Sequence, residues 1–115
     1  MKTDSAFWEE ITRVLTTHHL IIDRPVGQAH PHYPEMIYPL DYGYLENTSA
    51  SDGDGIDVWI GSQSDKILTG ILCTFDTLKQ DAEIKLLLGC AGDDLERIRS
   101  FYGNEMKILY VPMEP

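Results

Sequence analysis

The sequence predicts a small α+β domain that is mainly β, with one helix before the strands and one helix near the C-terminus. Apolar residues recur at helical spacing in residues 4–17 and again after residue 93, whereas the chain between them carries short apolar runs separated by Gly, Pro and Asp. With 115 residues and 43% apolar content, the chain is large enough for one core. We therefore expect residues 1–115 to form a single domain.

The first predicted elements are a helix and a short strand. Residues 4–17 can be capped by Asp4 or Ser5. Their single apolar stripe is formed by Phe7, Ile11, Val14 and Leu15. Leu20–Asp23 then predicts a buried strand. An extended loop is expected over residues 26–34, which contain Gly27, Pro31 and Pro34.

The remaining predicted elements are further strands and a second helix. Including the first, we expect about five strands, at residues 20–23, 56–60, 66–75, from residue 83 onward, and 106–111. Both faces of the strand at 66–75 are apolar, so it should lie inside the sheet rather than at an edge. Asp93 is expected to cap the second helix, which should end at Gly103.

Three carboxylates are concentrated in one loop, at Asp52, Asp54 and Asp57, with Gly53 and Gly55 between them. At a spacing of about 5 Å and an effective dielectric of about 20, each pair repels by roughly 3 kcal/mol. A bound cation relieves this repulsion, and ligands that are all oxygen favour magnesium, manganese or calcium over zinc. A solvated acidic turn is the alternative interpretation.

The residues around this loop form a longer motif. Tyr-Pro-x-Asp-Tyr-Gly-Tyr at 38–44 is followed by Thr48 and by Asp-Gly-Asp-Gly-Ile-Asp-Val at 52–58. This pattern resembles the soluble, magnesium-dependent family I inorganic pyrophosphatases, in which it reads Tyr-Pro-x-Asn-Tyr-Gly, Thr and Asp-Gly-Asp-Pro-x-Asp-Val. The resemblance implies a short, divergent member of that family, with a small, partly open, five-stranded β-barrel of the OB-like type.

The resemblance also implies a set of site residues. Two or more Mg²⁺ ions, or Mn²⁺ in their place, would be held by carboxylates, namely Asp52, Asp54, Asp57, Asp76, Glu83 or Asp81, and Asp23. Asp54 would act as the base toward a metal-bound water, with Lys85 and Tyr42 completing the catalytic residues. The phosphates of pyrophosphate would be held by Tyr42, Lys85, Tyr102, Tyr38, Arg24 and His32.

Several positions depart from the family pattern. Asp41 and Gly55 stand where Asn and Pro are usual, and Gly103 follows Tyr102 where the family has Lys. A hairpin that carries a phosphate-binding Arg in the family has no room between residues 34 and 38. The cationic phosphate clamp is therefore reduced while the carboxylates remain. Two alternatives to pyrophosphate hydrolysis follow: a metal- or phosphate-binding paralogue without turnover, and a hydrolase of another phosphoanhydride.

Composition restricts the partners and the location. Nine basic against 19 acidic residues give a net charge of −10, which argues against nucleic acid and anionic membranes as partners. The chain opens without a signal-peptide pattern and has no apolar run of transmembrane length, so a cytoplasmic protein is expected. Cys73 and Cys90 lie in apolar stretches and are expected to be reduced, buried thiols. The sequence is compatible with a homo-oligomer.

Overall fold

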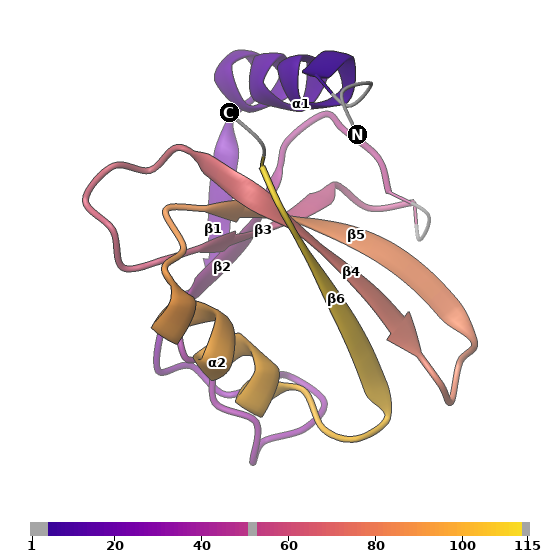
Figure 1. Cartoon of the computed structure of the whole chain (residues 1–115). Coiled ribbons are helices and arrows are strands. Elements are labelled where there is room, and N and C mark those ends of the chain that lie inside the picture. The colour runs from indigo at the N-terminus through magenta and orange to yellow at the C-terminus, as the bar shows by residue number, and fades with distance from the viewer. Residues whose placement is uncertain (1–4, 51–52, 114–115) are drawn as a thin grey trace.

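The computed structural model describes residues 5–50 and 53–113 and shows two helices and a six-stranded sheet within them (Figure 1). In chain order the elements are α1 Ser5–Thr17, β1 Leu20–Arg24, β2 Asp41–Leu45, β3 Ile56–Ile60, β4 Leu68–Asp76, β5 Asp81–Leu88, α2 Gly92–Phe101 and β6 Met106–Pro112. The strand order is β1-β2-β3-β5-β4-β6, and only the β3–β5 pairing is parallel among these strands. In the described residues β1 and β6 form the two edges of an open sheet.

The structure confirms the predicted fold class and adds one strand, β2. The segment Asp-Tyr-Gly-Tyr-Leu carries a weak strand signal, because Asp and Gly are both disfavoured in strands. Gly43 is nevertheless required there: a Cβ at this position would lie 2.0 Å from the carbonyl oxygen of Ile21 on β1. The close approach of β1 and β2 thus requires a glycine at position 43, and that same glycine makes a strand look unfavourable in the sequence.

Each face of the sheet is covered by one helix, because successive side chains of a strand point to opposite faces. Val58 and Leu86 belong to the core beneath α1, where Trp8 is 4% exposed. Trp59 and Leu87, the next residues along, belong to a second core beneath α2, which includes Ile98. Figure 1 shows α1 and α2 well apart on the two sides of the sheet.

The connection between β1 and β2 differs from the extended loop that was expected. It folds back on itself as a small hairpin, with the Gly27 amide donating to the Tyr38 carbonyl at 2.9 Å and the Tyr38 amide donating to the Gln28 carbonyl at 2.9 Å. A single bridge joins Ala29 to Ile37. We call residues 27–38 the β1–β2 hairpin.

The start of α2 also differs from the prediction. The N-cap residue is Ala91 rather than Asp93, and the carboxylate of Asp94 accepts the Ala91 amide at 2.8 Å. The same carboxylate accepts the amide of Ser62 at 3.0 Å and its hydroxyl at 2.9 Å. Asp94 therefore joins the start of α2 to the turn after β3.

Neither helix of the described chain is both long enough and apolar enough to cross a membrane.

Candidate active site

A row of polar side chains crosses the sheet on the face that α2 covers. Arg24 on β1 lies opposite Tyr42 on β2, so the two side chains share a face. Tyr42 lies opposite Trp59 on β3, and Asp57, two residues earlier, shares that face. Val58 on β3 is paired with Leu86 on β5. Asp57 and Lys85, each one residue before these partners, therefore lie on neighbouring strands at the same level of the sheet. Strand register thus brings groups from four strands together.

Lys85 is the centre of this row. Its ammonium group lies 2.8 Å from the Tyr42 hydroxyl, 3.0 Å from Asp57 Oδ2 and 3.5 Å from Glu83 Oε1. The Tyr42 hydroxyl donates to the same Asp57 oxygen at 2.6 Å. Lys85 is 7% exposed and Tyr42 is 8% exposed, so this network lies in a largely dry environment. We call these four residues the Lys85 cluster.

The electrostatics of the cluster keep its members in defined protonation states. Burial raises the pKa of Tyr42 well above its usual value, so its hydroxyl remains a donor. Burial alone would lower the pKa of Lys85, but the oxygens of Tyr102, Tyr42 and Asp57 raise it well above the usual lysine value. Lys85 is therefore a fixed positive charge that faces carboxylate oxygens.

The loop between β2 and β3 is closed by Thr48. Its hydroxyl donates to the Leu45 carbonyl at 2.7 Å and accepts the Ile56 amide at 3.0 Å, which joins the end of β2 to the start of β3. Gly53 has a φ of +87°, a conformation that favours glycine. Asp54 is exposed on this loop, and the predicted metal ligand Asp52 lies outside the described residues.

The other predicted carboxylates occupy different positions. Glu83 belongs to the Lys85 cluster, whereas Asp76 and Asp81 face each other at the end of the β4–β5 hairpin. Asp76 Oδ1 accepts the amides of Leu78 and Lys79 at 2.9 and 3.1 Å and so stabilises that turn.

Asp23 is exposed where the β1–β2 register shifts. No group of three or more Asp, Glu, His or Cys side chains suited to a metal ion forms among the described residues. The role of Asp23, Asp76 and Asp81 in metal binding therefore stays a prediction.

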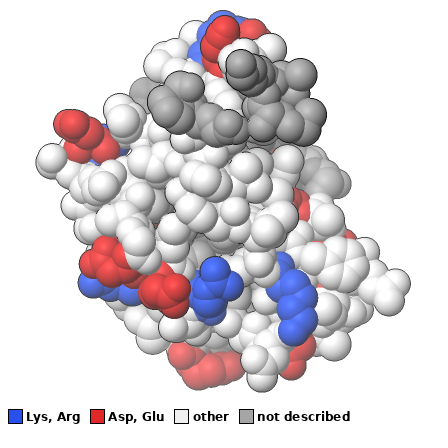
Figure 2. Space-filling model, viewed as in Figure 1, with Lys and Arg blue, Asp and Glu red and all other residues white. Residues whose placement is uncertain are grey.

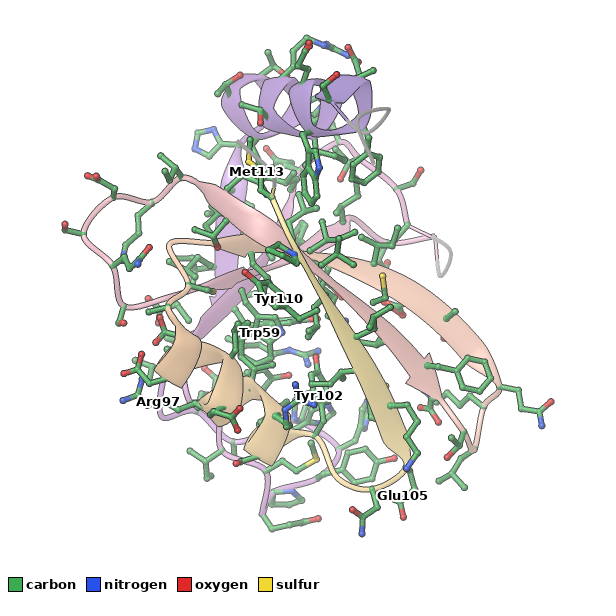
Figure 3. The ribbon with its side chains drawn as sticks, in the orientation of Figure 1. Trp59, Arg97, Tyr102, Glu105, Tyr110 and Met113 are labelled. Atoms are coloured by element: carbon green, nitrogen blue, oxygen red, sulfur yellow. The ribbon has the colours of Figure 1, made fainter. Side chains whose placement is uncertain are left out.

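The residues predicted to hold phosphate lie in two places. Arg24 donates to the Tyr38 hydroxyl, and its guanidinium carbon is 5.7 Å from the centre of that ring. Tyr102 ends α2, and burial raises its pKa while the charge of Lys85 lowers it, so its hydroxyl lies within electrostatic range of the cluster. Figure 3 shows Tyr102 and Trp59 between α2 and the sheet. His32 is exposed on the β1–β2 hairpin.

Two contributions to this region were missed at the level of sequence. Asp41 Oδ1 accepts the Val26 amide at 2.8 Å and so anchors the base of the β1–β2 hairpin to β2. His30 stacks on Tyr38, with ring centres 6.1 Å apart and planes 7° apart. His30 and His32 lie two residues apart in the same Pro-rich loop, so the sequence does not show which ring packs inward and which is exposed.

Two surface cavities lie near the site without including its centre. One, of about 540 Å³, is mostly apolar and is lined by Phe7, Ile11, Cys73, Ile84 and Glu83 among others. The other, of about 600 Å³, lies between the β1–β2 hairpin and α2. Neither is lined by Tyr42, Asp57 or Lys85, so of the Lys85 cluster only Glu83 reaches one of these two cavities.

Comparison with known proteins decides the family. A sequence model described as inorganic pyrophosphatase matches residues 10–81, which include Tyr42, Thr48 and Asp57. This chain belongs to the inorganic pyrophosphatase family.

Among individual relatives, the inorganic pyrophosphatases of Geobacillus stearothermophilus and Bacillus sp. (strain PS3) are each 37% identical over 60 residues. That match covers 45% of this chain and 36% of each relative. Glu83, Lys85 and Tyr102 lie beyond the segment that matches the family model, so the family assignment rests on the first part of the sheet.

Proposed function

We propose that this chain hydrolyses inorganic pyrophosphate to two phosphates and that it does so with Mg²⁺, for which Mn²⁺ can substitute. The observation that carries the proposal is the shared oxygen of Asp57, which accepts from both Tyr42 and Lys85 on neighbouring strands. Family membership supports the same reaction. A binding protein has no need to hold a buried ammonium, a hydroxyl and a carboxylate in one network beside a loop rich in aspartate.

The donor set of the site fits a hard divalent cation. Asp57 and Glu83 place carboxylate oxygens 3.0 and 3.5 Å from the single ammonium of Lys85, so two carboxylates from two strands already share one cation. We propose that these two residues would hold Mg²⁺ together with Asp54 and Asp52 of the adjoining loop. When bound, Mg²⁺ would neutralise phosphate charge and acidify a water molecule.

The side chains of this chain then have distinct tasks. Asp54 is the base that accepts a proton from the attacking water, whose oxygen forms a new bond to phosphorus as the bridging P–O bond breaks. Lys85 and Tyr42 supply a fixed positive charge and a hydroxyl donor to the departing phosphate, as pre-organised groups that need no rearrangement during the reaction. Arg24, Tyr38 and Tyr102 hold the substrate from the side of β1 and α2.

Phosphate release from pyrophosphate, measured with and without MgCl₂, tests this function. The wild type should release phosphate only with the metal, and Asp54→Asn should lower turnover by about 10²- to 10⁴-fold, the usual range for loss of a positioned base. Asp65→Asn, an exposed carboxylate in the turn after β3, is the matched control and should keep wild-type turnover.

Two results would contradict the proposal. A wild type that binds Mg²⁺ in calorimetry but releases no phosphate above background would assign the site to binding alone. Equal turnover in wild type and Asp54→Asn would remove Asp54 from the mechanism.

A further inference from the structure

Three groups gather around the buried ring of Tyr38, which is 3% exposed. The Arg24 guanidinium lies 5.7 Å from the ring centre, the His30 ring stacks 6.1 Å away, and Phe101 of α2 lies at 4.6 Å. The Tyr38 hydroxyl accepts a hydrogen bond from Arg24. One aromatic ring therefore orients both a guanidinium and an imidazole.

The hydrogen bonds of His30 define which of its nitrogens is a donor. Nδ1 lies 3.0 Å from the backbone amide of His32, which can only donate, so Nδ1 is an acceptor. The neutral ring must then carry its proton on Nε2. No described residue takes the Nε2 hydrogen bond, and His30 is half-buried, packed 5.1 Å from the ring of Tyr33.

The position of His30 relates it to the Lys85 cluster. The rings of Tyr38 and Tyr42 are 5.4 Å apart, and Arg24 lies directly opposite Tyr42 in the sheet. Tyr42 in turn contacts Lys85 and Asp57. His30 and Arg24 thus lie at the margin of the same site, one side chain beyond Tyr42.

The charges that act on His30 favour an anion beside it. Burial lowers the pKa of His30, and the positive charges of Arg24 on β1, His32 on the same hairpin and Lys79 at the β4–β5 turn lower it further, against the opposing effect of Glu35. In a chain of net charge −10, this is a local concentration of cationic and donor groups. Figure 2 shows Lys and Arg side chains interspersed with Asp and Glu in the lower half of the same view, below a largely uncharged centre.

We propose that His30 is a phosphate-positioning residue of this site, donating from Nε2 to a phosphate oxygen of bound pyrophosphate beside the guanidinium of Arg24. The inference rests on the proposed function. It offers a physical reason why the reduced set of basic residues near the motif is sufficient: the β1–β2 hairpin supplies an imidazole donor held in place by Tyr38.

Steady-state kinetics of three variants tests the inference. His30→Ala should raise KM for pyrophosphate about 10-fold with little change in kcat, because the lost bond is one to a charged group. His30→Gln, whose amide can donate from a similar position, should recover most of the loss. His19→Ala, on an exposed histidine between α1 and β1, is the control and should keep the wild-type KM. Unchanged KM in His30→Ala would overturn the proposal.

A second measurement uses the wild type alone, so it stands even where a variant fails to fold. Proton NMR follows the ring signal of His30, assigned through its own backbone in isotope-labelled wild type, during titration with methylenediphosphonate and MgCl₂. An anion at Nε2 should raise the pKa of His30, whereas the ring signals of His18 and His19, which directly follow α1, should not respond to the ligand. No change at His30 would overturn the proposal.

The two measurements separate this inference from the proposed function. A wild type that releases no phosphate, but whose His30 responds to methylenediphosphonate, would refute hydrolysis and retain His30 as an anion-binding residue. A wild type that is active, with an unresponsive His30 and an unaltered His30→Ala, would retain hydrolysis and refute the role of His30.

Discussion

The ammonium group of Lys85 is buried yet charged, because three oxygen atoms from Tyr42, Asp57 and Glu83 surround it. Each partner comes from a different part of the sequence, and each would be a costly buried group without the others. At the scale of single residues, the site is therefore also a stabilising element. Loss of one member leaves an uncompensated charge rather than an empty space.

Replacement of Lys85 by Met should show this cost. The variant keeps most of the side-chain volume but leaves Asp57 and Glu83 without their cation, so the free energy of unfolding should fall by about 3–5 kcal/mol. Urea denaturation at neutral pH measures the difference. Lys79→Met, on an exposed lysine of the β4–β5 turn, is the control and should stay within about 0.5 kcal/mol of wild type. Coincident unfolding curves for the two variants would show that the cluster contributes nothing to stability.

At the scale of elements, α2 holds one end of the site in place. Its N-terminus is joined to the turn after β3 through Asp94, and its C-terminus delivers Tyr102 to the neighbourhood of Lys85. Phe101, one residue earlier, packs on Tyr38 and Trp59. A substitution that disturbs the start of α2 should therefore also alter the positions of Phe101 and Tyr102 at its end.

The stability of the α2 attachment should depend on pH through Asp94. Burial raises the pKa of this carboxyl, but hydrogen bonds from Ala91 and Ser62 and the charge of Arg97 lower it more, so the folded-state pKa lies below the ordinary value of 3.8. A depressed pKa contributes stability above the unfolded-state value, and this contribution is lost as the pH falls through the folded-state value.

Asp94→Asn is the variant that tests this dependence. It should be less stable than wild type by about 1–3 kcal/mol at neutral pH, and the gap should shrink as the pH falls below 3.8. Asp93→Asn, whose side chain is 68% exposed, serves as the control with little effect at any pH. A gap that stays constant from neutral pH to acid would show that the charge of Asp94 is not what holds α2.

At the scale of the whole molecule, the excess of acidic residues opposes both folding and the approach of a polyanion. The net charge is −10, and Asp57 and Glu83 both lie beside Lys85 at the proposed substrate site. A divalent cation bound at this site would reduce both the repulsion among the carboxylates in the folded chain and their repulsion of the substrate. The native state should therefore be stabilised by Mg²⁺ through a specific site and not only through ionic strength.

Thermal unfolding with MgCl₂ and with NaCl of the same ionic strength tests this expectation. Mg²⁺ should raise Tm further than NaCl, because a ligand that binds only the native state stabilises it by about 2.7 kcal/mol at 100 times its Kd. Asp57→Asn should lose most of the difference between the salts, whereas Asp65→Asn should retain it. Equal shifts in the two salts would refute a specific metal site.

Local patterns in the sequence predicted much of this protein. The two helices and five of the six strands follow from helical spacing, apolar runs and turn residues, all of which act over a few neighbours. The loop at 52–57 was evident because its carboxylates adjoin one another in the chain. The prediction of β2 failed where Gly43, needed for the contact with Ile21, made a strand look unfavourable.

Only the tertiary structure decided how the site is assembled. Arg24, Tyr42, Asp57 and Lys85 share one face because of cross-strand register, and a shift of a single residue in any pairing would have turned its side chain to the other face. The fold of the β1–β2 hairpin likewise selected His30 rather than His32 to stack on Tyr38. Composition and local spacing do not encode these choices, because register and stacking depend on contacts between residues that are distant in sequence.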